Sequence, residues 1–237
     1  MTISLELNVL FTLVVGLGNW NVTPDALGPR VIGDLLVTRH IISLEPTVLG
    51  PGFRPVAAIS PGVLGLTGIE TGEIIQSLVE KIKPDMLVVV DALAARRMDR
   101  LYTTLQIADT GINPGSGVGN KRLAINKETI GVPVLALGVP TVVDAITIAA
   151  DAMDKLAEAM SREAVKESSF YQVLQELSWD EKKTLLAEVL TPYNGNLIVT
   201  PKEVDTLVAD IARLMAGAIN AALHPKIDYD DASKYLH

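Results

Sequence analysis

The sequence contains no cysteine, few aromatic residues and only three histidines. The absence of cysteine excludes disulfides, a thiol nucleophile and thiolate ligation of a metal, and it fits a reducing compartment. A catalytic nucleophile must therefore be oxygen-based. Aromatic residues make up 4% of the chain and hydrophobic residues 49%. The core must then consist of Val, Ile, Leu and Ala, the mixture found in buried parallel strands that helices cover.

Clustered cations and long apolar runs are also lacking. The formal charge is -8, and without a block of Lys and Arg the protein is not expected to bind nucleic acid. The apolar run 9–18 follows no Lys or Arg, so it predicts a core strand rather than a signal peptide. Gly, Pro or charged residues break the other runs well short of the roughly 20 residues that span a bilayer. We expect a soluble cytoplasmic protein without a membrane partner.

The apolar patterning predicts a single α/β domain over the 237 residues, with a core over about 9–160 and a C-terminal helical part over about 170–237. Strands are expected over 11–16, 56–59, 86–90, 103–108 and 132–138. Helices are expected between them, over about 23–40, 70–82 and 142–160. This alternation predicts a three-layer α/β/α sandwich of the phosphorylase/hydrolase-like type, with a mixed, largely parallel central sheet.

The last third of the chain is more charged and amphipathic. Residues 161–169 are the only plausible linker. Beyond them we expect an edge strand at 196–199 and helices over 171–177, 178–190 and 201–223.

Two aspartates follow predicted strands. Asp25 lies after the first strand and Asp91 directly follows residues 86–90. Reacting groups in open α/β sheets collect at the carboxyl ends of strands, so these side chains converge if their strands are neighbours. Two such carboxyls share a proton, and one can activate water while the other protonates a peptide carbonyl. Spacing alone nevertheless favours a simpler interpretation, in which Asp25 stabilises a helix N-terminus and Asp91 caps the next helix.

Several long strings stand in the order typical of spore germination proteases, and they cover nearly the whole chain. The chain therefore resembles that family. The strings are VVGLGNWNVTPDALGPRV (14–31), ISPGVLGLTGIET (59–71), DALAAR (91–96), TTLQIADTGINPGSGVGNKR (103–122), LGVPTVVDAITI (137–148) and VTPKEVD (199–205).

The resemblance implies an atypical aspartic endopeptidase that degrades small acid-soluble spore proteins in the spore core during germination. Members are made as zymogens and assemble as tetramers, so it also implies a homo-oligomer. It implies that the catalytic aspartates are those of TPDALG and DALAAR, namely Asp25 and Asp91. The chain begins almost at the first string, so we expect the N-terminal pro-segment region of the family to be absent. An inactive truncated subunit is therefore an alternative.

Six other residues are secondary site candidates: Asn19, Glu70, Arg96, Gly115, Ser116 and Gly117. The glycine-rich loop 114–121 fits neither the P-loop nor the Rossmann spacing, so we favour a tight active-site loop whose amides stabilise an oxyanion. Glu70 begins the helix 70–82, where an acid is favourable without any catalytic role. Arg96 can orient Asp91 or a substrate carboxylate, although a surface role is equally consistent.

A rival hypothesis is a metal-dependent endopeptidase. GLGN followed by an aspartate is similar to hydrogenase-maturation endopeptidases, but a third metal ligand is not evident. His40, His224 and His237 lie far apart in sequence, which favours solvated or helix-end positions. Asn113 stands where germination proteases commonly have histidine. Neither Ser60 nor Ser116 has the flanking pattern of a nucleophile elbow. No metal or other cofactor is therefore expected.

Overall fold

The computed structural model describes residues 10–45, 47–115, 122–162, 169–190 and 197–227. The chain forms two compact units. The first comprises Met1–Leu93, Leu105–Val139 and Lys202–His237, and the second comprises Ala94–Thr104 and Pro140–Pro201. Two long strands, β3 (Met86–Ala95) and β5 (Val134–Asp144), contribute residues to both units.

The strands in the described part of the chain form one sheet, with β3 at the middle of the strand order and β1 (Thr12–Gly16) next to it. The order is β2-β1-β3-β5-β4, where β2 is Val56–Ile59 and β4 is Gln106–Ala108. β1 pairs in parallel with both β2 and β3, whereas β4 pairs antiparallel with β5. The short strand β6 (Ile198–Val199) also pairs antiparallel with β5. The mixed, largely parallel sheet confirms the predicted fold class.

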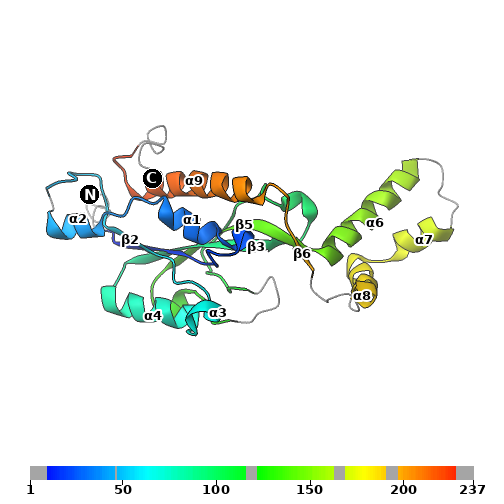
Figure 1. The fold of residues 1–237 in the computed structure, drawn as a ribbon, viewed down its shortest axis with the longest axis horizontal. Helices are drawn as coiled ribbons and strands as arrows, with labels where there is room; N and C mark the ends of the chain where they lie inside the picture. The colour runs from blue at the N-terminus through cyan, green and yellow to red at the C-terminus, as the bar shows by residue number, and fades with distance from the viewer. Residues whose placement is uncertain (1–9, 46, 116–121, 163–168, 191–196, 228–237) are drawn as a thin grey trace, which may run out of the picture. The chain divides into compact units, whose positions relative to one another are not determined.

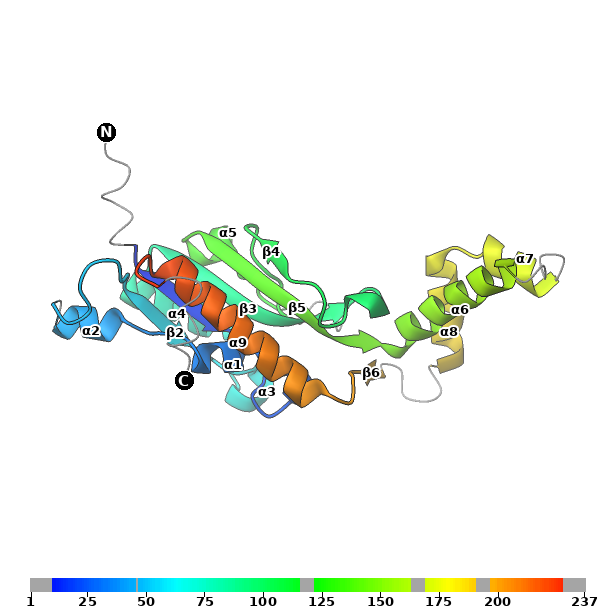
Figure 2. The same cartoon turned by 90° about the horizontal axis from the view of Figure 1, so that it is seen from above.

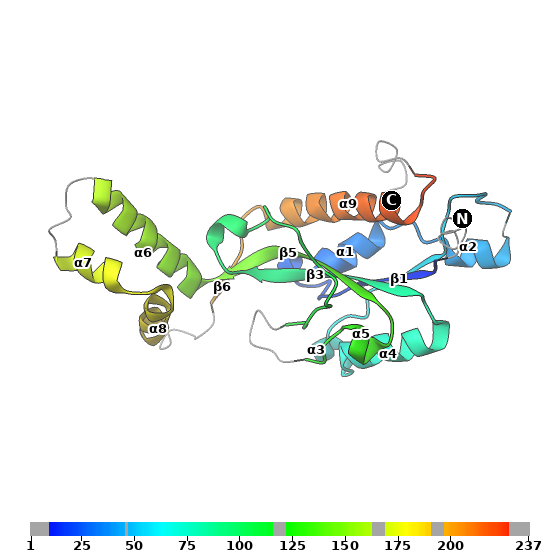
Figure 3. The same cartoon turned by 180° about the vertical axis from the view of Figure 1, so that it is seen from behind.

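Helices cover both faces of the sheet in the first unit (Figures 1 and 3). α1 (Leu27–Gly33) and α9 (Val204–Leu223) lie on one face. α4 (Thr71–Ile82) lies on the other, with the short helices α3 (Leu64–Thr67) and α5 (Lys127–Ile130). Alternate side chains of a strand point to opposite faces, and the α4 side collects the odd-numbered residues of β1 and β3. This core cluster includes Leu13, Val15, Leu87, Val89, Ile75 and Val79.

α9 is the one described helix that is long and apolar enough to cross a membrane by length and composition. Its buried residues include the small side chains Ala212, Ala216 and Gly217. Small residues let two helix backbones approach closely, and α9 packs along α1 (Figure 2). This is the packing of a core helix on the sheet.

The second unit is largely helical in its C-terminal part. α6 (Ala145–Arg162) packs against α7 (Ser169–Glu176) and α8 (Trp179–Leu190). Lys182 of α8 is buried and its Nζ lies 2.5 Å from Asp154 Oδ1 on α6. α8 begins with the reciprocal bonds of a capping box, because Ser178 N donates to Glu181 Oε2 at 2.8 Å and Glu181 N donates to Ser178 Oγ at 3.3 Å. The expected linker at 161–169 falls mostly outside the described residues.

The helix expected over 23–40 is instead three elements: the 3-10 turn η2 (Thr23–Asp25), α1, and α2 (Arg39–Leu44). Bonds to distant residues replace helical bonds after α1. Leu36 N donates to Asn220 Oδ1 at 3.0 Å, and Thr38 N donates to Val56 O at 3.0 Å. Tertiary contacts with α9 and β2 therefore end the helix.

The strands of the sheet are also longer than expected. β3 continues past residue 90 to Ala95, so Asp91 lies within the strand and does not cap a helix. β5 passes through Pro140, where a helix was expected to begin. The true start signal is Asp144, whose carboxylate accepts bonds from Thr147 N at 2.7 Å and Thr147 Oγ1 at 2.8 Å. In contrast, β4 begins only at Gln106, later than the predicted residue 103.

Two glycines allow β1 and α1 to approach at the backbone. A Cβ on Gly28 would lie 2.7 Å from the carbonyl carbon of Gly16, and it would overlap the carbonyl oxygen of Leu17. A Cβ on Gly16 would overlap the carbonyl oxygen of Gly28. The crossing therefore requires glycine on both segments, which precede and follow the loop that carries Asp25.

We predict that Gly28→Ala destabilises the protein by about 2 kcal/mol or more, because backbone atoms cannot move aside as a flexible side chain can. Gly33→Ala is the matched control on the same helix, since no atom lies within 4 Å of a Cβ added there. That variant should be neutral or more stable by about 0.5 kcal/mol, because alanine favours the helix. Urea unfolding of both variants measures the difference. Equal stabilities would contradict the close approach.

Candidate active site

Asp91 lies just beyond the end of β1. The last residue of β1, Gly16, is paired with Val90 of β3, and Leu17 N donates to Val90 O at 2.8 Å. β3 then continues with Asp91 while the chain of β1 turns away. Asp91 is only 7% exposed, and its Oδ1 accepts a bond from Ala92 N at 2.9 Å. A carboxyl group is thus buried within the central strand β3, next to the point where β1 ends.

Asp25 is held by the loop that follows β1. Asn19 N donates to Asp25 Oδ2 at 2.7 Å, and Asp25 N donates to Val22 O at 2.8 Å. Gly18 has a φ of 116°, and a Cβ there would overlap the carbonyl oxygen of Asp25. The bond from Asn19 ties the half-buried carboxylate of Asp25 to the backbone of its own loop. The site therefore depends on glycine at residue 18.

The two carboxyls lie within electrostatic reach of each other. Burial, and to a smaller extent the neighbouring charge of Asp25, together raise the pKa of Asp91 to about 7, although the bond from Ala92 N opposes this rise. Burial also raises the pKa of Asp25, but the bond from Asn19 N and the charge of Arg122 oppose this rise. As the pH increases, Asp25 loses its proton before Asp91 does. One acid and one base are therefore present together at neutral pH.

Arg122 is the residue that the sequence reasoning missed. It follows the segment 116–121, which lies outside the described residues, and its charge lowers the pKa of Asp25. The next residue, Leu123, packs against the first turn of α4, because a Cβ on Gly72 would lie 2.7 Å from Leu123 Cδ2. The only available signal was that Arg122 ends one of the family-like strings. The fold brings it from a distant part of the chain.

The secondary site candidates lie in different parts of the structure. Asn19 contributes its backbone N–H to Asp25, while its side-chain Oδ1 accepts a bond from Asn21 N at 3.0 Å. Glu70 is half-buried at the N-cap of α4 and makes no side-chain capping bond. Gly115 has a φ of 70° at the end of a described segment, whereas Ser116 and Gly117 lie outside the described residues. Arg96 is an exposed residue of the second unit.

Of the three histidines, His224 differs from the expectation in its burial. His40 is exposed, and His237 lies outside the described residues. His224 stands at the end of α9, as expected, but it is fully buried rather than solvated. Its Nδ1 accepts a bond from Arg54 N at 3.3 Å and its Nε2 lies 3.2 Å from Leu36 O. Within the described ranges, no group of three or more His, Asp and Glu side chains is placed to hold a metal ion.

Comparison with known proteins identifies the family. The chain matches the germination protease family over residues 8–175 and 158–236. It is 55% identical over 225 residues to the germination protease of Caldanaerobacter subterraneus subsp. tengcongensis, which covers 95% of this chain and 69% of that protein. The germination proteases of Clostridium acetobutylicum and Bacillus pumilus are 53% and 49% identical over the same shares of each chain.

The chain belongs to the germination protease family. It is therefore a peptidase, a hydrolase with a role in germination. Among solved structures, the chain is similar to the [NiFe] hydrogenase maturation protease HycI of Thermococcus kodakarensis KOD1, with a TM-score of 0.38 and 17% identity. That similarity covers 90% of this chain and 93% of HycI.

We predict that Asp91 of the germination protease titrates near pH 7 and that Asp25→Asn lowers its pKa, because the substitution removes a neighbouring negative charge. NMR titration of the ¹³C carboxyl signals measures both values. The exposed Asp210 on α9 provides a control, since Asp210→Asn should leave the Asp91 titration unchanged. An unshifted Asp91 titration in Asp25→Asn would show that the carboxyls do not interact.

The same burial predicts how stability depends on pH. An unfolded aspartate loses its proton near pH 3.8, whereas native Asp91 keeps it up to about pH 7. The unfolded state then binds fewer protons between these values, so the free energy of unfolding falls as pH rises through this window and stays lower above it. The total loss is no more than about 4 kcal/mol. In Asp91→Asn the fall in urea unfolding curves measured between pH 4 and 8 should become smaller, leaving the part that comes from the raised pKa of Asp25. A fall as large as that of the wild type would contradict the raised pKa of Asp91.

Proposed function

We propose that this germination protease is an endopeptidase that hydrolyses small acid-soluble spore proteins, with Asp25 and Asp91 as its reacting pair. The observation that carries the proposal is the buried carboxyl of Asp91, whose pKa of about 7 leaves it protonated beside the more acidic Asp25. A general acid is most effective when its pKa lies near the working pH. The raised pKa of Asp91 meets that condition.

The geometry supports a role for each carboxyl. Asp25, held by the Asn19 N–H and the charge of Arg122, is the ionised partner that removes a proton from water. The water oxygen forms a bond to the peptide carbonyl carbon while Asp91 donates its proton to the carbonyl oxygen. The tetrahedral intermediate then collapses, Asp25 passes its proton to the leaving amine as the C–N bond breaks, and Asp91 recovers the hydroxyl proton. Both carboxyls return to their starting states.

Family membership supports the biological setting of the proposal. We propose that the enzyme acts in the cytoplasm of the spore core, is made as a zymogen, and works as a homotetramer. The formal charge of -8 supports a protein substrate rather than nucleic acid, because phosphate backbones require clustered cations. Light scattering coupled to size-exclusion chromatography measures the tetramer directly.

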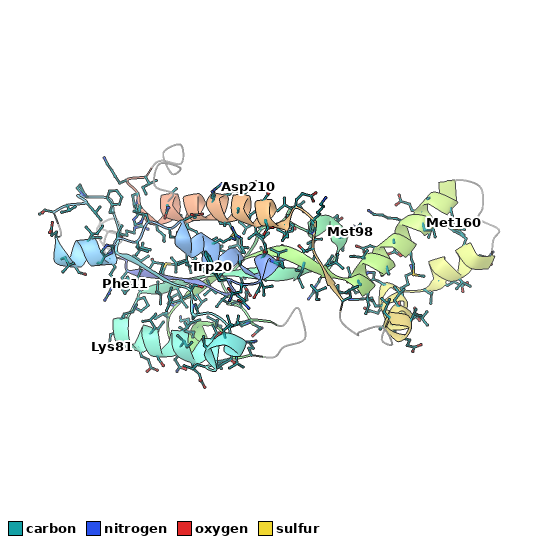
Figure 4. The ribbon with its side chains drawn as sticks, in the orientation of Figure 1. Phe11, Trp20, Lys81, Met98, Met160 and Asp210 are labelled. Atoms are coloured by element: carbon teal, nitrogen blue, oxygen red, sulfur yellow. The ribbon has the colours of Figure 1, made fainter. Side chains whose placement is uncertain are left out.

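We predict that Asp25→Asn and Asp91→Asn each reduce cleavage of a purified small acid-soluble spore protein by at least about a thousandfold, since each removes one half of the proton transfer. Asp210→Asn is the matched control on the exposed side of α9, where Figure 4 labels the residue, and it should retain full activity. Gel and mass-spectrometric analysis of the products gives the rates. Turnover retained in both Asn variants, or cleavage abolished by a chelator, would overturn the aspartate mechanism.

The role of Arg122 generates a separate prediction. Arg122→Gln should raise the pKa of Asp25, because it removes the positive charge that opposes the effect of burial. The acidic limb of the kcat/KM profile should then move to higher pH, while the basic limb, which reports Asp91, should stay in place. Lys127→Gln, on the exposed surface of α5, is the control. A profile in which both limbs are unchanged would mean that Arg122 does not act on Asp25.

A further inference from the structure

Trp20 is an exposed tryptophan inside the loop that holds Asp25. Its side chain is 61% exposed, although burying a large aromatic ring normally stabilises a fold. The residue directly follows Asn19, whose backbone N–H binds Asp25, and Figure 4 labels it. The indole therefore stands in solvent one residue from a contact of the reacting pair.

The exposure of Trp20 does not come from a loosely held backbone. Asn21 N donates to Asn19 Oδ1 at 3.0 Å, and Val22 N donates to Asn19 O at 3.1 Å. These bonds close a turn around Trp20, and the bond from Asn19 to Asp25 fixes the preceding residue. Val22, at the end of the turn, is itself 45% exposed. A rigid turn thus presents two apolar side chains to water.

A second segment with exposed apolar side chains starts at the same edge of the sheet. β2 pairs in parallel with β1, with Val15 beside Ile59, so the chain after β2 and the loop after β1 leave the sheet side by side. Leu64, Leu66 and Ile69 in this segment are 40%, 59% and 50% exposed. Hydrogen bonds also order this segment, since Gly68 N donates to Leu64 O at 2.8 Å and Ile69 N donates to Thr67 Oγ1 at 3.1 Å.

We propose that Trp20, Val22, Leu64, Leu66 and Ile69 form an apolar rim that binds the side chains of the polypeptide substrate next to the bond that is cleaved. The inference rests on the proposed function, which requires an extended polypeptide to reach Asp25 and Asp91. Exposed apolar side chains that collect around a site mark a binding surface, and aromatic anchors contribute most of the affinity of such surfaces. The rim selects substrates with Leu, Ile, Val or Phe within two residues of the scissile bond.

A cleavage map tests the preference. The wild-type enzyme and Trp20→Ala are incubated with a synthetic peptide library, and the cut bonds are read by mass spectrometry. Wild-type cuts should be enriched in apolar residues near the bond. Trp20→Ala should lose this enrichment, and its kcat/KM for an apolar-flanked peptide should fall roughly tenfold, mainly through KM. Trp179→Ala, which changes the other tryptophan of the chain, is the control and should match wild type. Leu66→Ser should reproduce part of the loss.

A binding measurement tests the apolar rim independently of the proposed aspartate mechanism. The variant Asp91→Asn with Trp179→Phe leaves Trp20 as the sole tryptophan and removes cleavage. Adding unfolded β-casein should move the emission of Trp20 to shorter wavelengths, whereas a peptide of Gly, Ser and Glu should not. An unchanged emission, or unchanged cleavage preference and KM in Trp20→Ala, would overturn the rim. Cleavage that survives in both Asn variants of the pair would instead overturn the mechanism and leave the rim standing.

Discussion

The burial of Asp91 is the constraint on which the rest of the site depends. Transferring an ionised carboxylate from water into a protein interior is unfavourable, so the group stays protonated unless a cation or several donors compensate for the loss of water. Asp91 receives one backbone bond, from Ala92, and it faces the negative charge of Asp25. Asp91 therefore keeps its proton because of the same desolvation that destabilises the fold at this position, and this is the proton that the proposed mechanism uses.

The second carboxyl owes its different behaviour to backbone geometry. Gly16 and Gly28 let β1 and α1 cross at close range, and Gly18 then turns the chain so that Asn19 N points at Asp25. A backbone donor cannot rotate away as a side chain can, so its bond to the carboxylate needs little reorganisation during the reaction. Side chains larger than hydrogen at these three positions would separate the two carboxyls. The chemistry of the pair thus depends on residues that carry no functional group.

The sequence predicted the layers of the fold because apolar periodicity is a local property. Residues 56–59 and 70–82 were assigned to within one residue, since a short apolar run and a capped amphipathic pattern determine each of them. The path after α1 was wrong, because Leu36 and Thr38 bind Asn220 and Val56, which no local pattern reveals. The extension of β3 and β5 was missed for a related reason: Pro140 is compatible with a helix start and with an extended strand, and pairing decides between them.

For the site, the sequence predicted two carboxyls that come together and share a proton, but it could not tell which groups around them shift the pKa of each. The position of Asp25 after the first strand followed from the pattern, whereas its bond to Asn19 depends on a left-handed glycine conformation that composition does not specify. Arg122 was not singled out because a lone cation beside a glycine-rich loop is common on surfaces. Its influence on Asp25 arises from the tertiary fold, in which the neighbouring residue Leu123 packs on α4.

The distribution of polarity around the carboxyl end of β1 reverses the usual arrangement of a folded protein. An acid is inside, where water would otherwise stabilise its charge, and a tryptophan is outside, where burial would otherwise stabilise the fold. Each departure lowers the stability of the fold, and in the function that we propose a peptide substrate compensates for both. The substrate's side chains would cover the indole, and its carbonyl would present an oxygen to the proton of Asp91. Covering the rim would also remove water from the pair and so strengthen the interaction between the carboxyls and the developing charge. The proposal thus links substrate binding and proton transfer through a single loop of residues 17–25.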